Sequence, residues 1–253
     1  MERVKNILAV IVNYSDEQLQ YLEEVVAAMK KFKKYNVTII VNSNIPLNIA
    51  GIDHVNVIEL EDYQLLPSTC KQVIWHYKDD FDGFLYTEND HLWLEHHIDN
   101  HLKYSEVLPN NRIPGLIQYE QKNSTSEKYY CAFAVNRFLQ GSRETYGGYE
   151  FARLVNIHQA SYFITKEQLD LVIKRNPNYF THIDNRVKTL TYSVKCRVNT
   201  DLFEFSGFEK VVCISEFDQN LIKHLPAVYI DGTLGRSKMR GTQQEMDEWI
   251  KTV

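Results

Sequence analysis

Two acidic residues stand two positions apart in the segment Thr87-Glu88-Asn89-Asp90, directly after the apolar residues Phe84-Leu85-Tyr86. The apolar residues predict a buried strand, and side chains alternate along a strand, so Glu88 and Asp90 are expected to point to the same side. Two such carboxylates can hold Mg²⁺ or Mn²⁺ and leave positions open for diphosphate oxygens. The ion would stabilise the charge on a departing nucleoside diphosphate. The alternative is that Asp90 caps the next helix and Glu88 is merely exposed.

A histidine-rich segment follows, with histidines at positions 91, 96, 97 and 101. His97 and His101 have the i, i+4 spacing of a metal-binding pair, but Ile98 follows His97, so the HExxH motif of zinc hydrolases is absent. We expect a polar helix over 92–104 that lines the site. The sequence also has no GxxxxGK[ST] phosphate loop and no GxSxG nucleophile motif, which excludes P-loop enzymes and α/β-hydrolases.

The elements that must position these residues begin with Ile7–Val12, an apolar run without alternation. Such a run predicts a strand covered on both faces, as in a parallel sheet. Ser15 or Asp16 can then cap a helix, whose apolar face consists of Leu19, Leu22, Val25, Val26 and Met29. The segments 37–41 and 55–60 predict two further strands. A β-α-β opening with short loops is typical of a doubly wound nucleotide-binding fold.

Composition narrows the class of protein. The 28 Lys and Arg against 33 Asp and Glu give a net charge of 28 − 33 = −5, which argues against a nucleic-acid binder and a polybasic membrane-surface module. No apolar stretch approaches the ~20 residues of a membrane-spanning helix. Four scattered cysteines without a CxxC pair predict reduced, mostly buried thiols and a cytoplasmic protein.

The later part of the chain predicts a helix over 68–77, a helix over 166–175 and a strand over 210–214. We find no repeat, no low-complexity stretch and no linker. We therefore expect a single α/β domain over 1–253, with a mixed, mostly parallel sheet flanked by helices. Within it, we expect two halves, over 1–104 and 105–235, and a polar C-terminal tail over 236–253.

This order of elements, with paired acids after a late strand of the first half, resembles the GT-A family of nucleotide-sugar glycosyltransferases. Glu88-Asn89-Asp90 is similar to the family's Asp-x-Asp motif, although Glu stands at its first acidic position. Lys223-His224-Leu225-Pro226 is similar to the late segment in which a histidine returns to the same metal ion. Over about 7–229, the resemblance implies a Rossmann-like GT-A domain in which Glu88, Asp90 and His224 hold Mn²⁺ or Mg²⁺. It also implies that 1–104 is the nucleotide-sugar-binding half and 105–235 the acceptor-binding half. The alternative for His224 is an ordinary surface histidine.

The same resemblance implies a site for the nucleotide. The residues implied lie at strand ends, beside the acids and on the helix before them, namely Asn13, Tyr14, Asn42, Ser43, Lys71 and Asn89. Tyr14 would stack on the base, and Lys71 would reach the ribose or the diphosphate. Each of these residues could instead be an ordinary loop or helix-surface residue.

The reaction would be transfer of a sugar from a UDP or GDP donor to a hydroxyl group of a glycan or other acceptor, as in polysaccharide biosynthesis. An inverting enzyme needs a carboxylate base for that hydroxyl, and the candidates are Asp184 first, Glu150 second, then Asp201 or Glu204. A retaining enzyme would need none. His158 and Gln159 are candidates for sugar contacts.

Two alternatives stay open. A nucleotidyltransferase acting on sugar phosphates shares the β-α-β opening and the paired acids, but it usually carries a glycine-rich loop that the segment 13–16 lacks. The other alternative is a glycan-binding or scaffold protein without catalysis. The sequence does not predict an oligomeric state.

Overall fold

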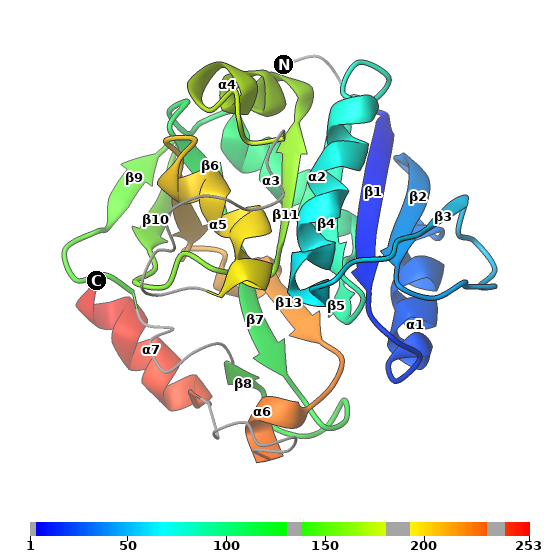
Figure 1. The fold of residues 1–253 in the computed structure, drawn as a ribbon. Coiled ribbons are helices and arrows are strands. Elements are labelled where there is room, and N and C mark those ends of the chain that lie inside the picture. Colours follow the sequence, from blue (N-terminus) through cyan, green and yellow to red (C-terminus); the bar gives the residue numbers. More distant parts are fainter. Residues whose placement is uncertain (1–3, 131–137, 181–192, 232–240) are drawn as a thin grey trace. The chain divides into compact units, whose positions relative to one another are not determined.

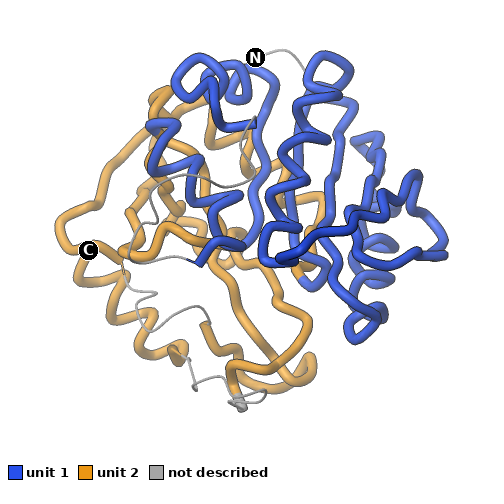
Figure 2. Tube along the Cα trace, viewed as in Figure 1, with its two compact units in different colours: residues 1–90, 160–207 blue, residues 91–159, 208–253 orange. Residues whose placement is uncertain are grey.

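The computed structural model describes residues 4–130, 138–180, 193–231 and 241–253. These residues divide into two compact units, each built from two separate segments of the chain. Unit 1 consists of 1–90 with 160–207, and unit 2 of 91–159 with 208–253 (Figure 2). The single domain over 1–253 stays a prediction, and each unit is described here by itself.

Unit 1 contains a mostly parallel five-stranded sheet (Figure 1). Its strands, in spatial order, are β11 (Ser161–Thr165), β4 (Gly83–Glu88), β1 (Asn6–Asn13), β2 (Asn36–Ser43) and β3 (His54–Val57). The strands β4, β1, β2 and β3 run parallel, and only β11 is antiparallel. In β1 every residue after Asn6 is buried, which agrees with the strand covered on both faces that the apolar run predicts.

Helices of unit 1 connect and cover these strands. They are α1 (Leu19–Met29), α2 (Leu66–His76), α4 (Lys166–Arg175) and α5 (Arg197–Glu204), with the short 3₁₀ helices η1 (Tyr63–Leu65) and η2 (Val194–Cys196). The helix α1 buries Leu22, Val25, Val26 and Met29, the apolar face expected from the sequence. The helix α2 packs on β1 and β2. The predicted α/β class with a mixed, mostly parallel sheet and flanking helices is therefore confirmed.

Unit 2 contains two four-stranded sheets. One has the order β6 (Arg112–Pro114), β12 (Glu209–Cys213), β10 (Tyr149–Arg153) and β9 (Glu144–Tyr146). The other has the order β5 (His91–Leu92), β13 (Leu221–His224), β7 (Ile117–Glu120) and β8 (Tyr129–Tyr130). In the second sheet β13 is antiparallel to β5 and parallel to β7. The strand β13, which comes late in the sequence, thus lies between β5 and β7, which come much earlier.

The helices of unit 2 are α3 (Glu95–Ser105), α6 (Val228–Asp231) and α7 (Gln243–Thr252), with the 3₁₀ helix η3 (Phe217–Asn220). The helix α7 lies in the segment that the sequence analysis treats as a polar tail. Thr242 accepts a hydrogen bond from the Glu245 amide, and the Glu245 carboxylate bonds back to Thr242, so a capping box begins this helix. Met246 is fully buried in a core cluster, which anchors α7 to the unit.

Two further findings concern the whole described chain. Cys70, Cys196 and Cys213 are buried free thiols, as predicted, whereas Cys131 lies outside the described residues. In the part of the chain that the structure describes, no helix combines the length and the apolar character needed to cross a membrane.

Candidate functional site

The carboxyl ends of three parallel strands in unit 1 are joined by side-chain hydrogen bonds. Asn89, just after β4, donates to the Asn13 Oδ1 at the end of β1 over 2.7 Å. Asn13 in turn donates to the Ser43 Oγ at the end of β2 over 3.2 Å. All three side chains are buried. The structure therefore brings together three of the residues for which the resemblance implies nucleotide contacts, at the edge where open α/β sheets bind ligands.

Tyr14 follows this group directly and is 58% exposed. Its ring lies 5.5 Å from the ring of Tyr63, measured between centroids. Ser15, the next residue, has a positive φ of 62°, and its amide donates to Asn44 Oδ1 over 2.7 Å, so a tight turn ends the strand. An exposed aromatic ring beside a strand end can stack on a planar base.

Asn42 does not join the Asn13 group, although it is the neighbour of Ser43. Its side chain donates to Thr69 Oγ1 over 2.8 Å and accepts from Asn56 over 2.9 Å. This arrangement follows from the alternation of side chains along β2, which sends adjacent residues to opposite faces. The three side chains line a cavity of about 590 Å³ within unit 1, whose role is not assigned.

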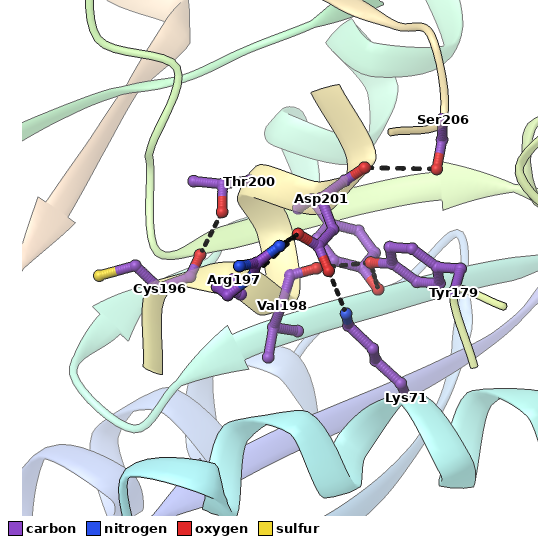
Figure 3. A network of polar contacts seen from close by, with 9 residues as sticks. Lys71, Tyr179, Cys196, Arg197, Val198, Thr200, Asp201 and Ser206 are labelled. Atoms are coloured by element: carbon purple, nitrogen blue, oxygen red, sulfur yellow. Dashed lines mark hydrogen bonds and ion pairs between the residues drawn. The ribbon is translucent and has the colours of Figure 1, made fainter. Parts of the chain in front are cut away.

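Lys71 lies in a group of charges that we name the ionic cluster, formed by Lys71, Arg197 and Asp201 in unit 1 (Figure 3). Its ammonium donates to Asp201 Oδ2 over 3.1 Å, and Arg197 donates to Asp201 Oδ1 over 3.1 Å. Lys71 is 2% exposed, and its Nζ lies 4.2 Å from the centroid of the Tyr179 ring. These contacts give Lys71 a place in the interior of the unit; its predicted contact with ribose or diphosphate stays a prediction.

The candidate bases lie in different surroundings. Asp201 belongs to the ionic cluster, and burial together with Asp201 raises the pKa of nearby Glu204. Glu150 lies in β10, and its half-exposed carboxylate accepts from Arg143 over 3.4 Å. The glycines 147 and 148 take positive φ values in the tight β9–β10 turn. Asp184 lies outside the described residues.

The second sheet of unit 2 aligns three side chains that we name the histidine cluster, formed by His91, His224 and Glu120. His91 and His224 are cross-strand partners in β5 and β13, with ring centroids 5.4 Å apart. Glu120 ends β7, which pairs with β13 on its other side. Glu120 Oε1 accepts a hydrogen bond from His224 Nδ1 over 2.7 Å. All three residues are buried, and Glu120 has no exposed surface.

Asp90 is joined to His91 by a peptide bond, so it neighbours the histidine cluster through the chain itself. Within unit 2, the cross-strand pair of His91 and His224 brings two imidazoles together. Carboxylates and imidazoles are metal ligands, so these residue types fit a divalent ion. The roles of Asp90 and His224 as ligands stay predictions. Glu88 ends β4, half-buried; its role as a ligand also stays a prediction.

His97 of α3 has a structural role. His97 Nδ1 accepts from the Leu94 amide over 3.1 Å, and its Nε2 donates to the Leu221 carbonyl over 3.0 Å. Burial lowers the pKa of His97 to about 3, so this imidazole is neutral. His97 thereby ties α3 to β13, the strand that carries His224.

The residues proposed for sugar contacts also have structural partners within unit 2. The Gln159 Oε1 accepts from the Leu116 amide over 3.0 Å. The His158 carbonyl accepts from Lys210 Nζ over 3.2 Å, and burial lowers the pKa of Lys210 to about 7. Their contacts with a sugar stay predictions.

The comparisons with known proteins yield a structural likeness. No family model and no curated protein matches the chain. Among solved structures, residues 1–349 of TarS from S. aureus are similar, with a TM-score of 0.51 and 9% sequence identity, over 88% of this chain and 61% of that one. TarS is a glycosyltransferase. The fold of this chain is similar to that of TarS. At this identity the likeness concerns the fold alone, and the chain spans less than two thirds of that structure.

Sequence reasoning missed Glu120 and did not assign a ligand role to His91. The local sequence around Glu120, at the end of a short apolar strand, carries no motif. His91 was visible as the residue after Asp90, but it was grouped with the histidines of the following helix. Only the pairing of β13 with both β5 and β7 brings these residues to His224.

Proposed function

We propose that this chain is a metal-dependent glycosyltransferase. It would transfer a sugar from a nucleoside diphosphate donor of the UDP or GDP type to a hydroxyl group of a glycan or other acceptor. The observation that carries the proposal is the pair of buried imidazoles of His91 and His224 in unit 2, with Asp90 directly before His91 in the chain. The likeness of the fold to that of TarS supports the same reading of these residues.

The ion would be held by Asp90, His91 and His224, with Glu88 as a further candidate. When bound, it supplies positive charge that stabilises a departing nucleoside diphosphate. Two imidazoles in the set favour Mn²⁺ over Mg²⁺, because Mg²⁺ prefers oxygen ligands and octahedral geometry. We therefore expect Mn²⁺ to support donor binding better than Mg²⁺.

The nucleotide would be bound at the strand ends of unit 1. The hydrogen bonds among Asn13, Ser43 and Asn89 fix the ends of β1, β2 and β4 relative to one another. Tyr14 presents an exposed ring there for stacking on the base. The fixed strand ends would orient the donor without a loss of side-chain entropy on binding.

Deprotonation of the acceptor would need a carboxylate if the transfer inverts the anomeric centre. Asp184 and Glu150 are the candidates carried from the sequence. The half-exposed carboxylate of Glu150 can reach a ligand, but it forms an ion pair with Arg143.

Calorimetry with UDP and with GDP, each with and without Mn²⁺, tests the proposal directly. We expect one nucleotide to bind in a Mn²⁺-dependent way, and a double Asp90→Ala, His224→Ala variant to lose that dependence. Incubation with UDP- and GDP-sugars in Mn²⁺ should then release the nucleoside diphosphate slowly by hydrolysis.

The matched control is Asp218→Ala with His54→Ala, which removes the same residue types at exposed positions. This variant should bind like the unsubstituted chain. Nucleotide binding with unchanged metal dependence in the Asp90, His224 variant would contradict the proposal. Absence of nucleotide binding would favour a scaffold protein, and release of pyrophosphate from a nucleoside triphosphate with a sugar phosphate would favour a nucleotidyltransferase.

A further inference from the structure

The geometry points to Glu120 as a positioning residue that fixes the His224 imidazole for metal binding and joins it to the helix α6. This inference rests on the proposed function, because it gives Glu120 its role through a metal ion on His224. It goes beyond that function because it assigns a positioning role to Glu120, a fully buried carboxylate that lies in no sequence motif.

The carboxylate of Glu120 is surrounded by hydrogen-bond donors within unit 2. Oε1 accepts from His224 Nδ1 over 2.7 Å. The Tyr229 amide donates to both oxygens, at 3.2 and 3.1 Å, and the Ile230 amide donates to Oε2 over 2.9 Å. A buried carboxylate without partners would cost several kcal/mol, so these donors are what allow the charge to be there.

The donor set also determines the tautomer of His224. The two peptide N–H groups can only donate, so the carboxylate acts as an acceptor toward both. The same acceptor at 2.7 Å from His224 Nδ1 requires the proton to lie on Nδ1. In a neutral imidazole with Nδ1–H, the lone pair that can bind a metal ion is on Nε2. Glu120 therefore selects the ligand nitrogen as well as the orientation of the ring.

A carboxylate that holds the second nitrogen of a histidine ligand is a recurring arrangement in metal sites. It raises the basicity of the ligand nitrogen and fixes the ring, and its removal typically weakens metal binding by about 10- to 100-fold. Here the carboxylate comes from the neighbouring parallel strand, whereas His91 approaches His224 from the opposite side.

The same carboxylate couples His224 to α6. Tyr229 and Ile230 belong to α6, and the Tyr229 ring lies 5.5 Å from the His224 ring between centroids. Glu120 is thus a common anchor for the metal-ligand histidine and for the segment that follows it. We expect the amide protons of Tyr229 and Ile230 to exchange more slowly when Mn²⁺, or diamagnetic Mg²⁺ in its place, is bound.

The first test needs no variant of Glu120. In protein labelled with ¹⁵N-histidine and free of metal, the His224 signals, assigned by their loss in His224→Ala, should show the proton on Nδ1. A proton on Nε2 would overturn the inference, and this result would hold even if variants of Glu120 failed to fold.

The second test measures the affinity for Mn²⁺ by calorimetry. Glu120→Gln should bind Mn²⁺ about 10- to 100-fold more weakly. If Glu120 acts through His224, the same substitution added to His224→Ala should change the remaining affinity by less than about threefold. Equal losses in the two backgrounds, or an unchanged affinity of Glu120→Gln, would overturn the role.

The matched control is Glu216→Gln. Glu216 is also a carboxylate of unit 2 that accepts from a tyrosine and a cation, Tyr104 and Lys103, but it has no contact with His224 among the described residues. It should leave Mn²⁺ affinity unchanged. An unchanged affinity of Glu120→Gln, in a chain that still binds Mn²⁺ and nucleotide, would refute the inference alone. Absence of Mn²⁺ binding by the unsubstituted chain would refute the metal-dependent function and the inference together.

Discussion

The ionic cluster of unit 1 and the histidine cluster of unit 2 are both buried, but they are built from opposite kinds of groups. In the ionic cluster, two cations donate hydrogen bonds to the single carboxylate of Asp201 (Figure 3). In the histidine cluster, two imidazoles lie beside each other and one of them bonds to Glu120. Ammonium and guanidinium groups have no lone pair to offer a metal ion, whereas imidazoles do.

This difference in composition predicts different roles, folding stability for the ionic cluster and ligand binding for the histidine cluster. The ionic cluster joins two cations to one carboxylate and ties α2 to α5, so its loss should lower the stability of the fold. The histidine cluster, with Asp90 beside it in the chain, assembles metal-ligating groups, so its loss should be felt in binding. Each of the following predictions tests this contrast between the two clusters.

The largest effect is expected for Asp201→Asn. It leaves two buried cations facing a neutral amide, which should lower the free energy of unfolding by about 3–5 kcal/mol. Urea denaturation measures this loss. Mn²⁺ affinity of the folded variant should stay unchanged, and a parallel loss of affinity would show that the ionic cluster also serves the metal group.

The next effect is expected for His224→Ala, and here Mn²⁺ affinity should change more than the free energy of unfolding. Mn²⁺ affinity should fall by about 100-fold or more, equivalent to about 2.8 kcal/mol, because a ligand is lost together with its carboxylate partner. Metal-free stability should fall by only about 1–2 kcal/mol. Calorimetry and urea denaturation on the same preparation separate the two, with His54→Ala as the control. If the free energy of unfolding fell by more than the free energy of Mn²⁺ binding, His224 would have a structural role instead.

A smaller effect concerns pH and His97. The folded pKa is about 3, below the ~6.5 of an unfolded histidine, so the unfolded state binds more protons between these values. His97 should therefore stabilise the fold above pH ~6.5 and lose that contribution as the pH falls, by about 2 kcal/mol between pH 6.5 and 5. Urea midpoints across this range measure it. In His97→Asn the slope should be shallower, and an unchanged slope would mean that other groups carry the acid sensitivity.

The smallest effect is expected for Glu150→Gln. The carboxylate forms a half-exposed pair with Arg143, so its loss should change the free energy of unfolding by less than about 1 kcal/mol. The sugar-transfer activity of the same variant should be measured beside its stability. A fall of about 100-fold or more in sugar transfer, without loss of stability, would identify Glu150 as the base.

Much of unit 1 could be predicted from the sequence because its signals are local. The run Ile7–Val12 and the apolar face of α1 each lie within a few residues of one another, and parallel strands bring their carboxyl ends to one edge. The GT-A resemblance groups Asn13, Ser43 and Asn89 as nucleotide contacts, and side-chain hydrogen bonds at these strand ends join the same three residues. Asn42 was grouped with them by position, although alternation along the strand sends it to the other face.

The histidine cluster could be predicted only in part because its contacts are not local. Glu120 and His224 are 104 residues apart, and their strands run parallel, a pairing for which short sequence segments give no signal. The buried partners of Lys71 were missed for the same reason, since Asp201 follows 130 residues later. The helix α7 was a different case: Thr242 and Glu245 form a local capping signal that the sequence analysis passed over.

The division of each unit into two chain segments has a consequence for synthesis. A ribosome completes β1 to β4 first, but the edge strand β11 of that sheet emerges only after most of unit 2 has been made. His91 and Glu120 then wait for β13, one of the last strands to emerge. A nascent chain that stalls or is cut before His224 therefore holds His91 and Glu120 without the third residue of the histidine cluster, and neither unit is encoded by one uninterrupted part of the gene.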